Sequence, residues 1–220
     1  MSIATNILSI RKHLPEHVQL VCVSKFHPVE AIEEAYLTGE RVFGESKVQE
    51  MTGKYERLPK DIQWHFIGHL QTNKVKYITP YVSLIHGVDS VKLLAEIDKQ
   101  AEKVGRKINC LLQVHIATEE TKFGFDEEEL LQCFDGSRVE QFRNVTICGL
   151  MGMATFTTDN QQVKTEFEKL KSIFDNLKAG VFKQNSAFTQ LSMGMSDDYP
   201  IAIACGSTMV RIGSSIFGSR

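Results

Sequence analysis

Residues 20–44 read LVCVSKFHPVEAIEEAYLTGERVFG, and this stretch decides the fold class. It begins with an apolar, β-branched run, Leu20–Ser24, which is typical of a buried strand. Pro28 suits the start of a helix, and Gly39 ends the helical pattern that follows. A second short run, Arg41–Gly44, comes next. The stretch therefore predicts strand, helix and strand in succession, which is the repeating unit of a parallel sheet.

The same alternation continues to the end of the chain. The predicted strands are Leu20–Ser24, Arg41–Gly44, Trp64–Gly68, Val82–Val88, Ile108–Ile116, Thr146–Met153, Gln190–Met193 and Thr208–Ile212. Helical patterns separate them; Ser90 is placed to cap one helix, and Asp126 with Glu129 has capping-box spacing before another. Eight units of about 27 residues favour closure into a single (β/α)8 TIM barrel over a doubly wound open sheet, the alternative. We predict one α/β domain over residues 1–220, with an extra N-terminal helix within Met1–Leu14.

Composition and charge exclude several classes of protein. The chain has 25 Lys and Arg against 27 Asp and Glu, a formal net charge of -2, which argues against a nucleic-acid partner. No apolar run approaches the roughly 20 residues of a membrane span, and the N-terminus has no apolar core of a signal peptide. The five cysteines include no CxxC pair, which favours free thiols in a reducing compartment. We expect a cytoplasmic protein.

Lys25 is the first candidate for chemistry because it directly follows the first predicted strand. In a (β/α)8 barrel the active site lies at the carboxyl ends of the strands. A lysine amine that is partly removed from water there is a nucleophile towards aldehydes. The alternative is an ordinary solvated lysine at a strand end, and this position alone favours that alternative.

The segment LSMGMSDDYPIAIACGSTMVRIGSSIFG, residues 191–218, changes that balance. Two Ser/Gly clusters accompany its two predicted strands, and we place both at the strand ends that face the barrel mouth. The clusters are Ser192, Gly194 and Ser196, and then Gly206, Ser207 and Thr208. Glycines let a phosphate approach the backbone, and hydroxyl and N–H groups donate to it. The alternative is two ordinary turns, but barrels often bind phosphate at this place, so a phosphate site is favoured.

Arg211 and two histidines are further polar candidates. Arg211 stands inside an apolar run, so its guanidinium needs an acceptor: a carboxylate, or the ring nitrogen of a bound pyridine. His65 and His69 have H-x-x-x-H spacing, but strand-like residues separate them and Phe66 stands where a metalloprotease motif has Glu. We therefore predict no metal site. His69 is instead a candidate for the barrel mouth, and His65 for a half-buried, hydrogen-bonded position.

Six stretches together resemble the YggS/PROSC family of pyridoxal phosphate homeostasis proteins. They are VSKFHP, FGES, WHFIGHLQTNKVKYI, TKFG, GLMGMAT and LSMGMSDDYPIAIACGSTMVRIGSSIFG. The resemblance implies a fold-type III barrel, like the N-terminal domain of alanine racemase, that carries pyridoxal 5'-phosphate (PLP). It implies an aldimine, a Schiff base, between PLP and Lys25, and places Arg211 near the ring nitrogen.

The resemblance also implies the rest of the cofactor site. The predicted cofactor-binding residues are Lys25, Ser46, His69, Met151, Ser192, Met193, Gly194, Gly206, Ser207, Thr208, Arg211 and Gly213. Among them Ser192, Gly206, Ser207 and Thr208 match the family's phosphate-binding positions. The chain departs from the family at Ser46 and Lys47, where Asn and Tyr are usual, which puts one polar contact with the cofactor in doubt.

The expected function is to hold PLP for vitamin B6 and amino-acid homeostasis rather than to catalyse a reaction. Alanine racemase-like enzymes take an opposing tyrosine from an added domain at the dimer interface, and this chain stops at Arg220. We therefore predict no catalytic residue and a monomer, with PLP-dependent apoenzymes as possible recipients. Two alternatives remain open: a weak PLP-dependent amino-acid racemase, and a PLP-free barrel that binds phosphorylated ligands.

Overall fold

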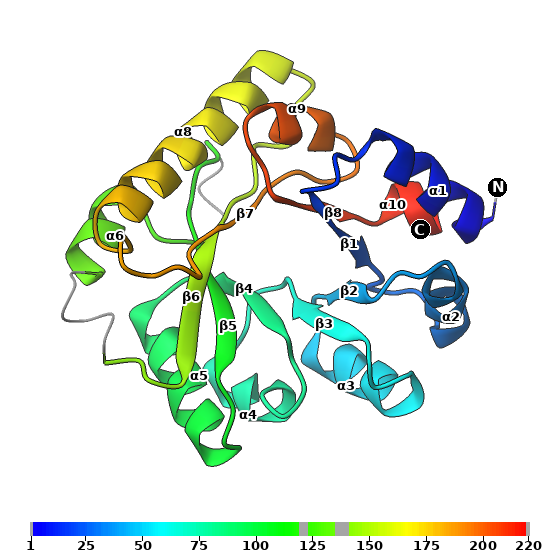
Figure 1. Ribbon diagram of the computed structural model, residues 1–220, viewed down its shortest axis with the longest axis horizontal. Helices are drawn as coiled ribbons and strands as arrows, with labels where there is room; N and C mark the ends of the chain where they lie inside the picture. The colour runs from blue at the N-terminus through cyan, green and yellow to red at the C-terminus, as the bar shows by residue number, and fades with distance from the viewer. Residues whose placement is uncertain (1, 119–122, 135–140, 219–220) are drawn as a thin grey trace.

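The computed structural model describes residues 2–118, 123–134 and 141–218 as a closed barrel of parallel strands (Figure 1). The strands are β1 (Gln19–Val23), β2 (Val42–Glu45), β3 (Gln63–Phe66), β4 (Leu84–Val88), β5 (Ile108–Gln113), β6 (Val145–Met151), β7 (Gln190–Ser192) and β8 (Met209–Ile212). They pair in chain order, and β8 returns to β1 with Val21 opposite Arg211. This pairing confirms the predicted TIM barrel and excludes the open sheet, whose edge strands would not meet.

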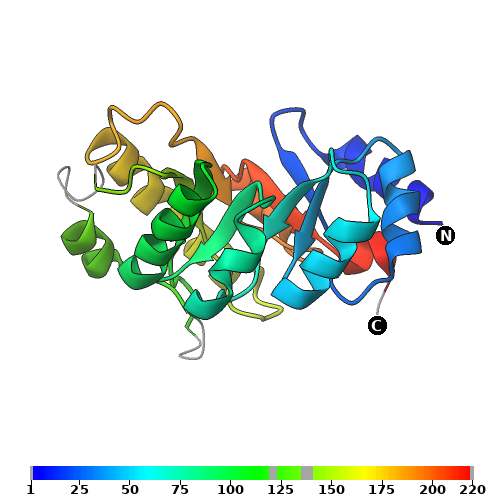
Figure 2. The same cartoon turned by 90° about the horizontal axis from the view of Figure 1, so that it is seen from below.

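Helices surround the barrel on its outside. They are α1 (Ile3–His13), α2 (Val29–Leu37), α3 (Val48–Arg57), η1 (Thr72–Lys74), α4 (Val75–Ile78), α5 (Val91–Lys103), α6 (Glu127–Cys133), α8 (Asn160–Ala179), α9 (Tyr199–Ala204) and α10 (Ser214–Phe217). Figure 2 shows α3, α4 and α5 across the outer face of the strands. The predicted N-terminal helix is α1, which packs on α10 and brings the chain's two ends together; Asn6 Nδ2 donates to the carbonyl of Ile216 at 2.9 Å.

The predicted helix caps are confirmed. The Ser90 hydroxyl accepts a hydrogen bond from the backbone N–H of Leu93 at 3.3 Å, at the start of α5. Asp126 and Glu129 form a reciprocal capping box before α6, with bonds of 2.7 and 3.1 Å. These bonds satisfy N–H groups that the first helical turn leaves unpaired.

The predicted fifth strand, Ile108–Ile116, ends earlier than expected, at Gln113.

The apolar core has two layers, one on each side of the barrel wall. The larger layer lies between strands and helices and includes Trp64, Phe167 and Phe188. The smaller layer fills the barrel interior with Val21, Val42, Leu84, Leu111, Cys148, Met151 and Met209. Interior positions carry polar side chains as well, and these include His65, His86, Ser192 and Arg211, all buried. In this fold, polar side chains towards the carboxyl ends of the strands are those that can reach a ligand.

Two further findings bear on the sequence expectations. In the described part of the chain, no helix is long and apolar enough to cross a membrane. All five cysteines are free thiols, with Cys22, Cys110 and Cys148 buried and the other two partly exposed.

Candidate functional site

A pocket of about 280 Å³ opens at the carboxyl ends of the strands. It is lined from the junctions that follow β1, β3, β6, β7 and β8, and its polar lining includes Lys25, His27, Ser196, Arg211 and Ser214. Its volume lies at the lower end of the range for small-molecule sites. The pocket therefore brings the predicted lysine and arginine to one place at the barrel mouth.

The turn that carries Lys25 has an unusual backbone. The next residue, Phe26, has φ +68°, and it is the one non-glycine residue of the described chain with a positive φ. The N–H of Phe26 donates to Glu50 Oε1 at 2.5 Å, and the N–H of His27 donates to the carbonyl of Ser24 at 3.1 Å. Left-handed backbone costs a non-glycine residue roughly 1–2 kcal/mol, so these bonds hold the turn in a conformation that it would otherwise leave.

Lys54, from α3, anchors this turn behind the pocket. Its Nζ donates to the carbonyl of Ser24 at 2.9 Å, to Glu45 Oε1 at 2.8 Å and to Glu50 Oε1 at 2.7 Å. The hydroxyl of Ser24 also donates to Glu45 Oε1, at 2.6 Å. Burial raises the pKa of Glu45, which is fully buried, while the Lys54 cation opposes that rise. We call Ser24, Glu45, Glu50 and Lys54 the anchor cluster.

Arg211 is buried beneath the pocket without a carboxylate on its guanidinium in the described residues. Its Nη1 donates to the carbonyl of Ser192 at 3.0 Å and to the Ser192 hydroxyl at 2.7 Å, and its Nη2 donates to the carbonyl of Gly152 at 3.2 Å. Burial lowers the pKa of Arg211 to about 10, and the nearby charge of Asp198 opposes this. The first of the two predicted acceptors for Arg211, a hydrogen-bonded carboxylate, is therefore absent among the described residues.

The loop after β7 is tied to the end of β8. The carbonyl of Gly194 accepts from the N–H of Arg211 at 3.0 Å, and the hydroxyl of Ser196 accepts from the N–H of Gly213 at 3.2 Å. Asp198 Oδ1 fixes the same loop by accepting from the N–H of Met195 at 2.5 Å. The pocket wall between these junctions therefore presents hydroxyls, backbone and the Arg211 cation, which suit an anion, and it also contains one carboxylate, that of Asp197.

Comparisons with known proteins agree with this geometry. The family of alanine racemase N-terminal domains matches residues 1–220. A pyridoxal phosphate homeostasis protein of Aquifex aeolicus is 42% identical, with 92% of this chain and 87% of the relative covered. Another from Synechocystis is 40% identical, with 94% of both chains covered. The chain belongs to the family of pyridoxal phosphate homeostasis proteins.

Solved structures support the same assignment. PipY of Synechococcus elongatus, solved without PLP, is 37% identical and superposes with a TM-score of 0.91, covering 99% of this chain and 100% of PipY. PipY with PLP bound is 36% identical, with a TM-score of 0.88 and the same coverage. An alanine racemase of Clostridium difficile has a TM-score of 0.76 at 14% identity, which shows a shared fold alone. The resemblance inferred from the motifs is confirmed.

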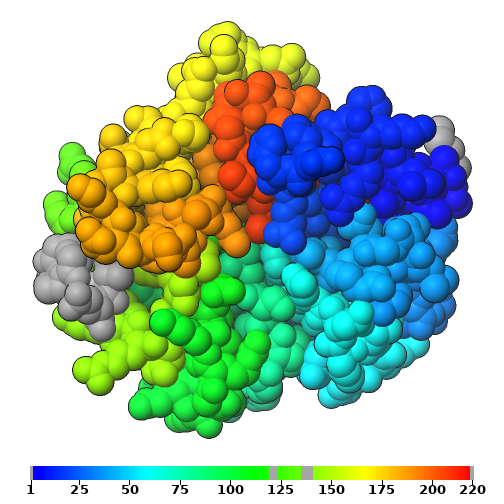
Figure 3. Space-filling view, in the orientation of Figure 1, coloured from blue at the N-terminus to red at the C-terminus, as the bar shows by residue number. Residues whose placement is uncertain are grey.

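Three predicted site residues lie at the end of the barrel opposite the mouth pocket. Gly206, Ser207 and Thr208 precede β8 rather than follow it, and the carbonyl of Thr208 accepts from the N–H of Gln19 at the start of β1. Figure 3 shows that end, where the orange-red segment before β8 lies beside the blue segment before β1. Every residue that precedes a strand of a parallel barrel gathers at its amino end. The prediction that these residues line the mouth is wrong.

Those three residues have structural partners instead. The Ser207 hydroxyl, 1% exposed, is within bonding distance of the carbonyls of Leu191, Met193 and Met209, at 2.8–3.2 Å. The hydroxyl of Thr208 accepts from the N–H of Leu191 at 2.8 Å. Both hydroxyls therefore join β7 to β8.

Other predicted residues lie near the mouth but are covered by protein. Ser192 is fully buried, and its hydroxyl is taken by Arg211. Met151 lies in the barrel interior, and Met193 packs in the outer layer of the core. Gly194 has φ +96°, and a Cβ there would come within 2.6 Å of the Cβ of Ala202. Of the twelve predicted positions, the pocket lining contains Lys25, Arg211 and Gly213.

Ser46 and His69 follow β2 and β3 but are not part of the pocket lining. His69 Nδ1 lies 2.8 Å from Asp89 Oδ2, and its ring stacks on Phe123 with centroids 4.2 Å apart. His65 points into the barrel instead and is 4% exposed, so the half-buried position predicted for it is wrong. The two histidines do not converge, and the described residues contain no group of three side chains suited to a metal.

Both serines that line the pocket are absent from the predicted site. They are Ser196, which belongs to the first Ser/Gly cluster, and Ser214. The signal was available, because each follows a predicted strand whose carboxyl end faces the mouth. From the TKFG motif, Thr121 and Lys122 lie outside the described residues.

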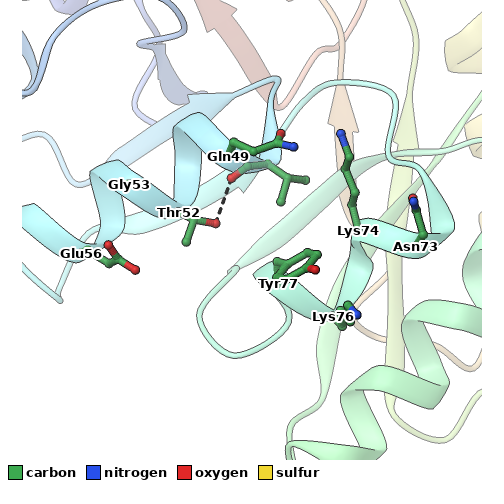
Figure 4. A pocket seen from close by; sticks show the side chains of 9 residues that line it. Gln49, Thr52, Gly53, Glu56, Asn73, Lys74, Lys76 and Tyr77 are labelled. Atoms are coloured by element: carbon green, nitrogen blue, oxygen red, sulfur yellow. Dashed lines mark hydrogen bonds between the residues drawn. The ribbon is translucent and has the colours of Figure 1, made fainter.

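A larger cavity, of about 680 Å³, lies between α3 and the η1–α4 segment (Figure 4). Gln49 and Thr52 contribute from α3, and Lys74 and Tyr77 from the other side. The Thr52 hydroxyl donates to the carbonyl of Val48 at 2.9 Å, within α3 itself. This groove is outside the barrel and contains neither Lys25 nor Arg211, so the smaller mouth pocket is the candidate site.

Proposed function

We propose that this chain binds PLP in the mouth pocket, covalently attached to Lys25, and holds it for PLP homeostasis. The observation that carries the proposal is that Lys25 and Arg211 line one pocket. It is supported by PipY, which is 36% identical to this chain and has been solved with PLP bound. PLP supplies an aldehyde, which condenses with a lysine amine and releases one water. The half-buried Lys25, fixed by the anchor cluster, is the amine we assign to that bond.

The residues present fit such a ligand. Gly213 lies close against β1 in the pocket wall, because a Cβ there would stand 3.1 Å from the carbonyl oxygen of Val23, so a larger residue would crowd this wall. The hydroxyls of Ser196 and Ser214 stand on the same wall, and we propose them as the phosphate contacts. Arg211 approaches from beneath as a donor that cannot accept, which suits an unprotonated ring nitrogen.

The same arginine favours holding over turnover. A protonated ring nitrogen makes PLP a strong electron sink, and a guanidinium beside that nitrogen disfavours its protonation. We therefore propose that efficient amino-acid chemistry is not the role of this site. Incubation with L-alanine in deuterated water tests this: Cα labelling no faster than with free PLP is expected, and labelling well above it would favour the racemase alternative.

Borohydride reduction followed by peptide mapping tests the central proposal. Protein incubated with PLP and then reduced should carry the pyridoxyl mass on the peptide that contains Lys25. Lys25→Ala should lose the adduct, whereas Lys103→Ala, an exposed lysine in α5, should keep it. An adduct elsewhere, or a protein that stays colourless with PLP, would overturn the assignment and favour the PLP-free alternative.

We propose further that the protein is a monomer that delivers PLP to PLP-dependent apoenzymes in the cytoplasm. The free thiols of the chain support a reducing compartment. Size-exclusion chromatography with light scattering tests the monomer. Transfer from the loaded protein to an apoenzyme faster than from free PLP at equal concentration tests the delivery.

A further inference from the structure

A continuous hydrogen-bond chain crosses the barrel interior beneath the pocket. It starts at Arg211 Nη1, which lies 2.7 Å from the Ser192 hydroxyl, and passes to His86 Nδ1 at 3.1 Å. His86 Nε2 then lies 3.0 Å from His65 Nδ1. The four side chains come from β8, β7, β4 and β3, and none is more than 4% exposed. Four strands are thus linked by polar groups that water hardly reaches.

We propose that this chain carries its protons in one direction, away from Arg211, and that His86 and His65 position Arg211 towards the cofactor ring, a role that rests on the proposed function. A guanidinium only donates, so the Ser192 oxygen accepts from Arg211. The hydroxyl proton of Ser192 is then directed to His86 Nδ1. His86 therefore carries its proton on Nε2 and donates to His65 Nδ1. This leaves the His65 proton on Nε2, which is not one of the fully buried, unpartnered polar atoms of the described residues.

The reversed direction leaves a donor without an acceptor. If His86 carried its proton on Nδ1, the Ser192 oxygen would accept from both His86 and Arg211. Its own hydroxyl proton would then need a third partner, and among the described residues the side chain of Ser192 bonds to those two alone. A buried donor with no acceptor is rare in folded proteins, because it loses its bond to water without replacement.

Neither histidine is positioned to carry a charge instead. Burial lowers the pKa of His65 to about 3. Burial also lowers the pKa of His86 well below its ordinary value, and the neighbouring His65 and the Arg211 cation lower it further. The groups that face His86 are thus a neutral imidazole, a hydroxyl and, beyond it, a cation.

The direction has an electrostatic consequence for Arg211. A chain of donors that all point away from the guanidinium presents the negative end of each dipole towards it. The cation is thereby stabilised while buried, and among the described residues no carboxylate is hydrogen-bonded to it, although the charge of Asp198 lies near it. The two bonds from Nη1 to Ser192 also fix the plane of the guanidinium. His86 and His65 thus act through Ser192, as positioning residues rather than contacts of the ligand.

Nitrogen NMR of histidine-labelled full-length protein without cofactor tests the direction. We expect His65 and His86 to be Nε2-protonated, and to stay so between about pH 6 and pH 8, as burial requires. Ser192→Ala removes the hydroxyl that sets the direction, so both rings should become mixtures of tautomers, whereas Ser192→Thr should keep the single form. His86 protonated on Nδ1 in the native protein, or unchanged tautomers in Ser192→Ala, would overturn the proposal.

Loss of PLP from the loaded protein tests the positioning role. His86→Phe keeps a ring but breaks the chain, and should release PLP up to roughly tenfold faster, the upper end of what one hydrogen bond between neutral groups contributes. His86→Phe combined with Ser192→Ala should be no worse than the more severe single change, because both break one chain. His17→Asn, an exposed histidine before β1, is the matched control. Additive effects would overturn the role.

The two measurements separate this inference from the proposed function. A wild-type protein that takes up no PLP would refute the proposed function and with it the positioning role. The tautomers of the cofactor-free protein would still decide whether the chain is directional. Ser192→Ala deletes a single oxygen, so it provides a folded variant should His86→Phe fail to fold.

Discussion

Lys54→Met should destabilise the protein strongly, and in a way that depends on pH. The substitution keeps most of the buried stem but removes a charge that makes three hydrogen bonds of 2.7–2.9 Å, from a side chain that is 7% exposed. It leaves the carboxylate of Glu45, which is fully buried, without its cation. Breaking a buried ion pair in this manner costs about 3–5 kcal/mol. In a domain of this size that corresponds to a fall in Tm of about 6–20 °C.

The pH dependence follows from Glu45. Its pKa in the folded protein is already raised above the ordinary value by burial, so its favourable contribution is present at low pH and is lost as pH rises through that raised pKa. Lys54 is what opposes the rise. Without Lys54 the pKa of Glu45 rises further, and the interval over which stability is lost extends towards neutral pH. The cost of Lys54→Met should therefore be small near pH 4.5 and largest at neutral pH.

Urea denaturation of wild type and variant at about pH 4.5 and pH 7.5 measures this difference directly. Lys103→Met, on the exposed side of α5, is the control and should change stability by less than about 0.5 kcal/mol. In a Glu45→Gln background the cost of Lys54→Met should lose most of its pH dependence, since the fully buried carboxylate is gone and Glu50 is the carboxylate partner that remains. An equal cost at both pH values in the wild-type background would refute the electrostatic account and leave packing as the cause.

Five further substitutions have expected outcomes. Gly149→Ala should prevent folding, because its backbone has φ +152° and a Cβ there would clash with the carbonyl oxygen of Gln190. Gly53→Ala in α3, where a Cβ would meet nothing within 4 Å, should instead stabilise the protein by about 0.5–1 kcal/mol. Circular dichroism and thermal melts compare the two. Ser207→Ala should cost about 1–3 kcal/mol of stability and leave PLP retention unchanged. Ser214→Ala should weaken PLP retention and leave stability unchanged. Urea denaturation measures the stability, and dialysis of the loaded proteins measures the retention. Ser90→Ala should cost about 1 kcal/mol through the lost helix cap, measured by urea denaturation.

The predicted strands match the structure because each is a compact apolar run between strong helix signals. The run Leu20–Ser24 became β1 at Gln19–Val23, and Gln190–Met193 became β7 at Gln190–Ser192. Placing Lys25 at the mouth required only this order, since a residue that follows a strand of a parallel barrel has one end to go to. The lysine was therefore predictable.

The misplaced phosphate residues show where the same rule was not applied. The predicted strand Thr208–Ile212 already put Gly206 and Ser207 before it, at the amino end of the barrel. Their composition resembles that of a phosphate site, but chain order decides at which end of the barrel they lie. Ser214 follows the same strand and lines the pocket, although its neighbourhood has a similar Ser/Gly content. Position relative to a strand discriminates between such clusters, and residue type does not.

The buried polar contacts could not be read from the sequence, because they depend on register. The bond between His65 and His86 requires the offset with which β3 pairs β4, where Leu84 is opposite His65. The ion pair of Glu45 and Lys54 requires the angle at which α3 packs on β2. Neither quantity leaves a periodic signal in the residues themselves.

The two buried cations near Lys25 are stabilised by opposite means, and this difference has a functional meaning. Lys54 is neutralised by two carboxylates outside the barrel, so it shapes the turn without adding charge to the pocket. Arg211 is stabilised by carbonyls and a hydroxyl, which leave its positive charge in place beneath the pocket. An anionic ligand would then meet a cation that has no hydrogen-bonded carboxylate among the described residues and that only the nearby charge of Asp198 partly offsets, in a poorly screened site. If Arg211 had the carboxylate partners and Lys54 had the carbonyl and hydroxyl partners, the net charge of the protein would be unchanged. The attraction between the pocket and an anionic ligand would then be lost.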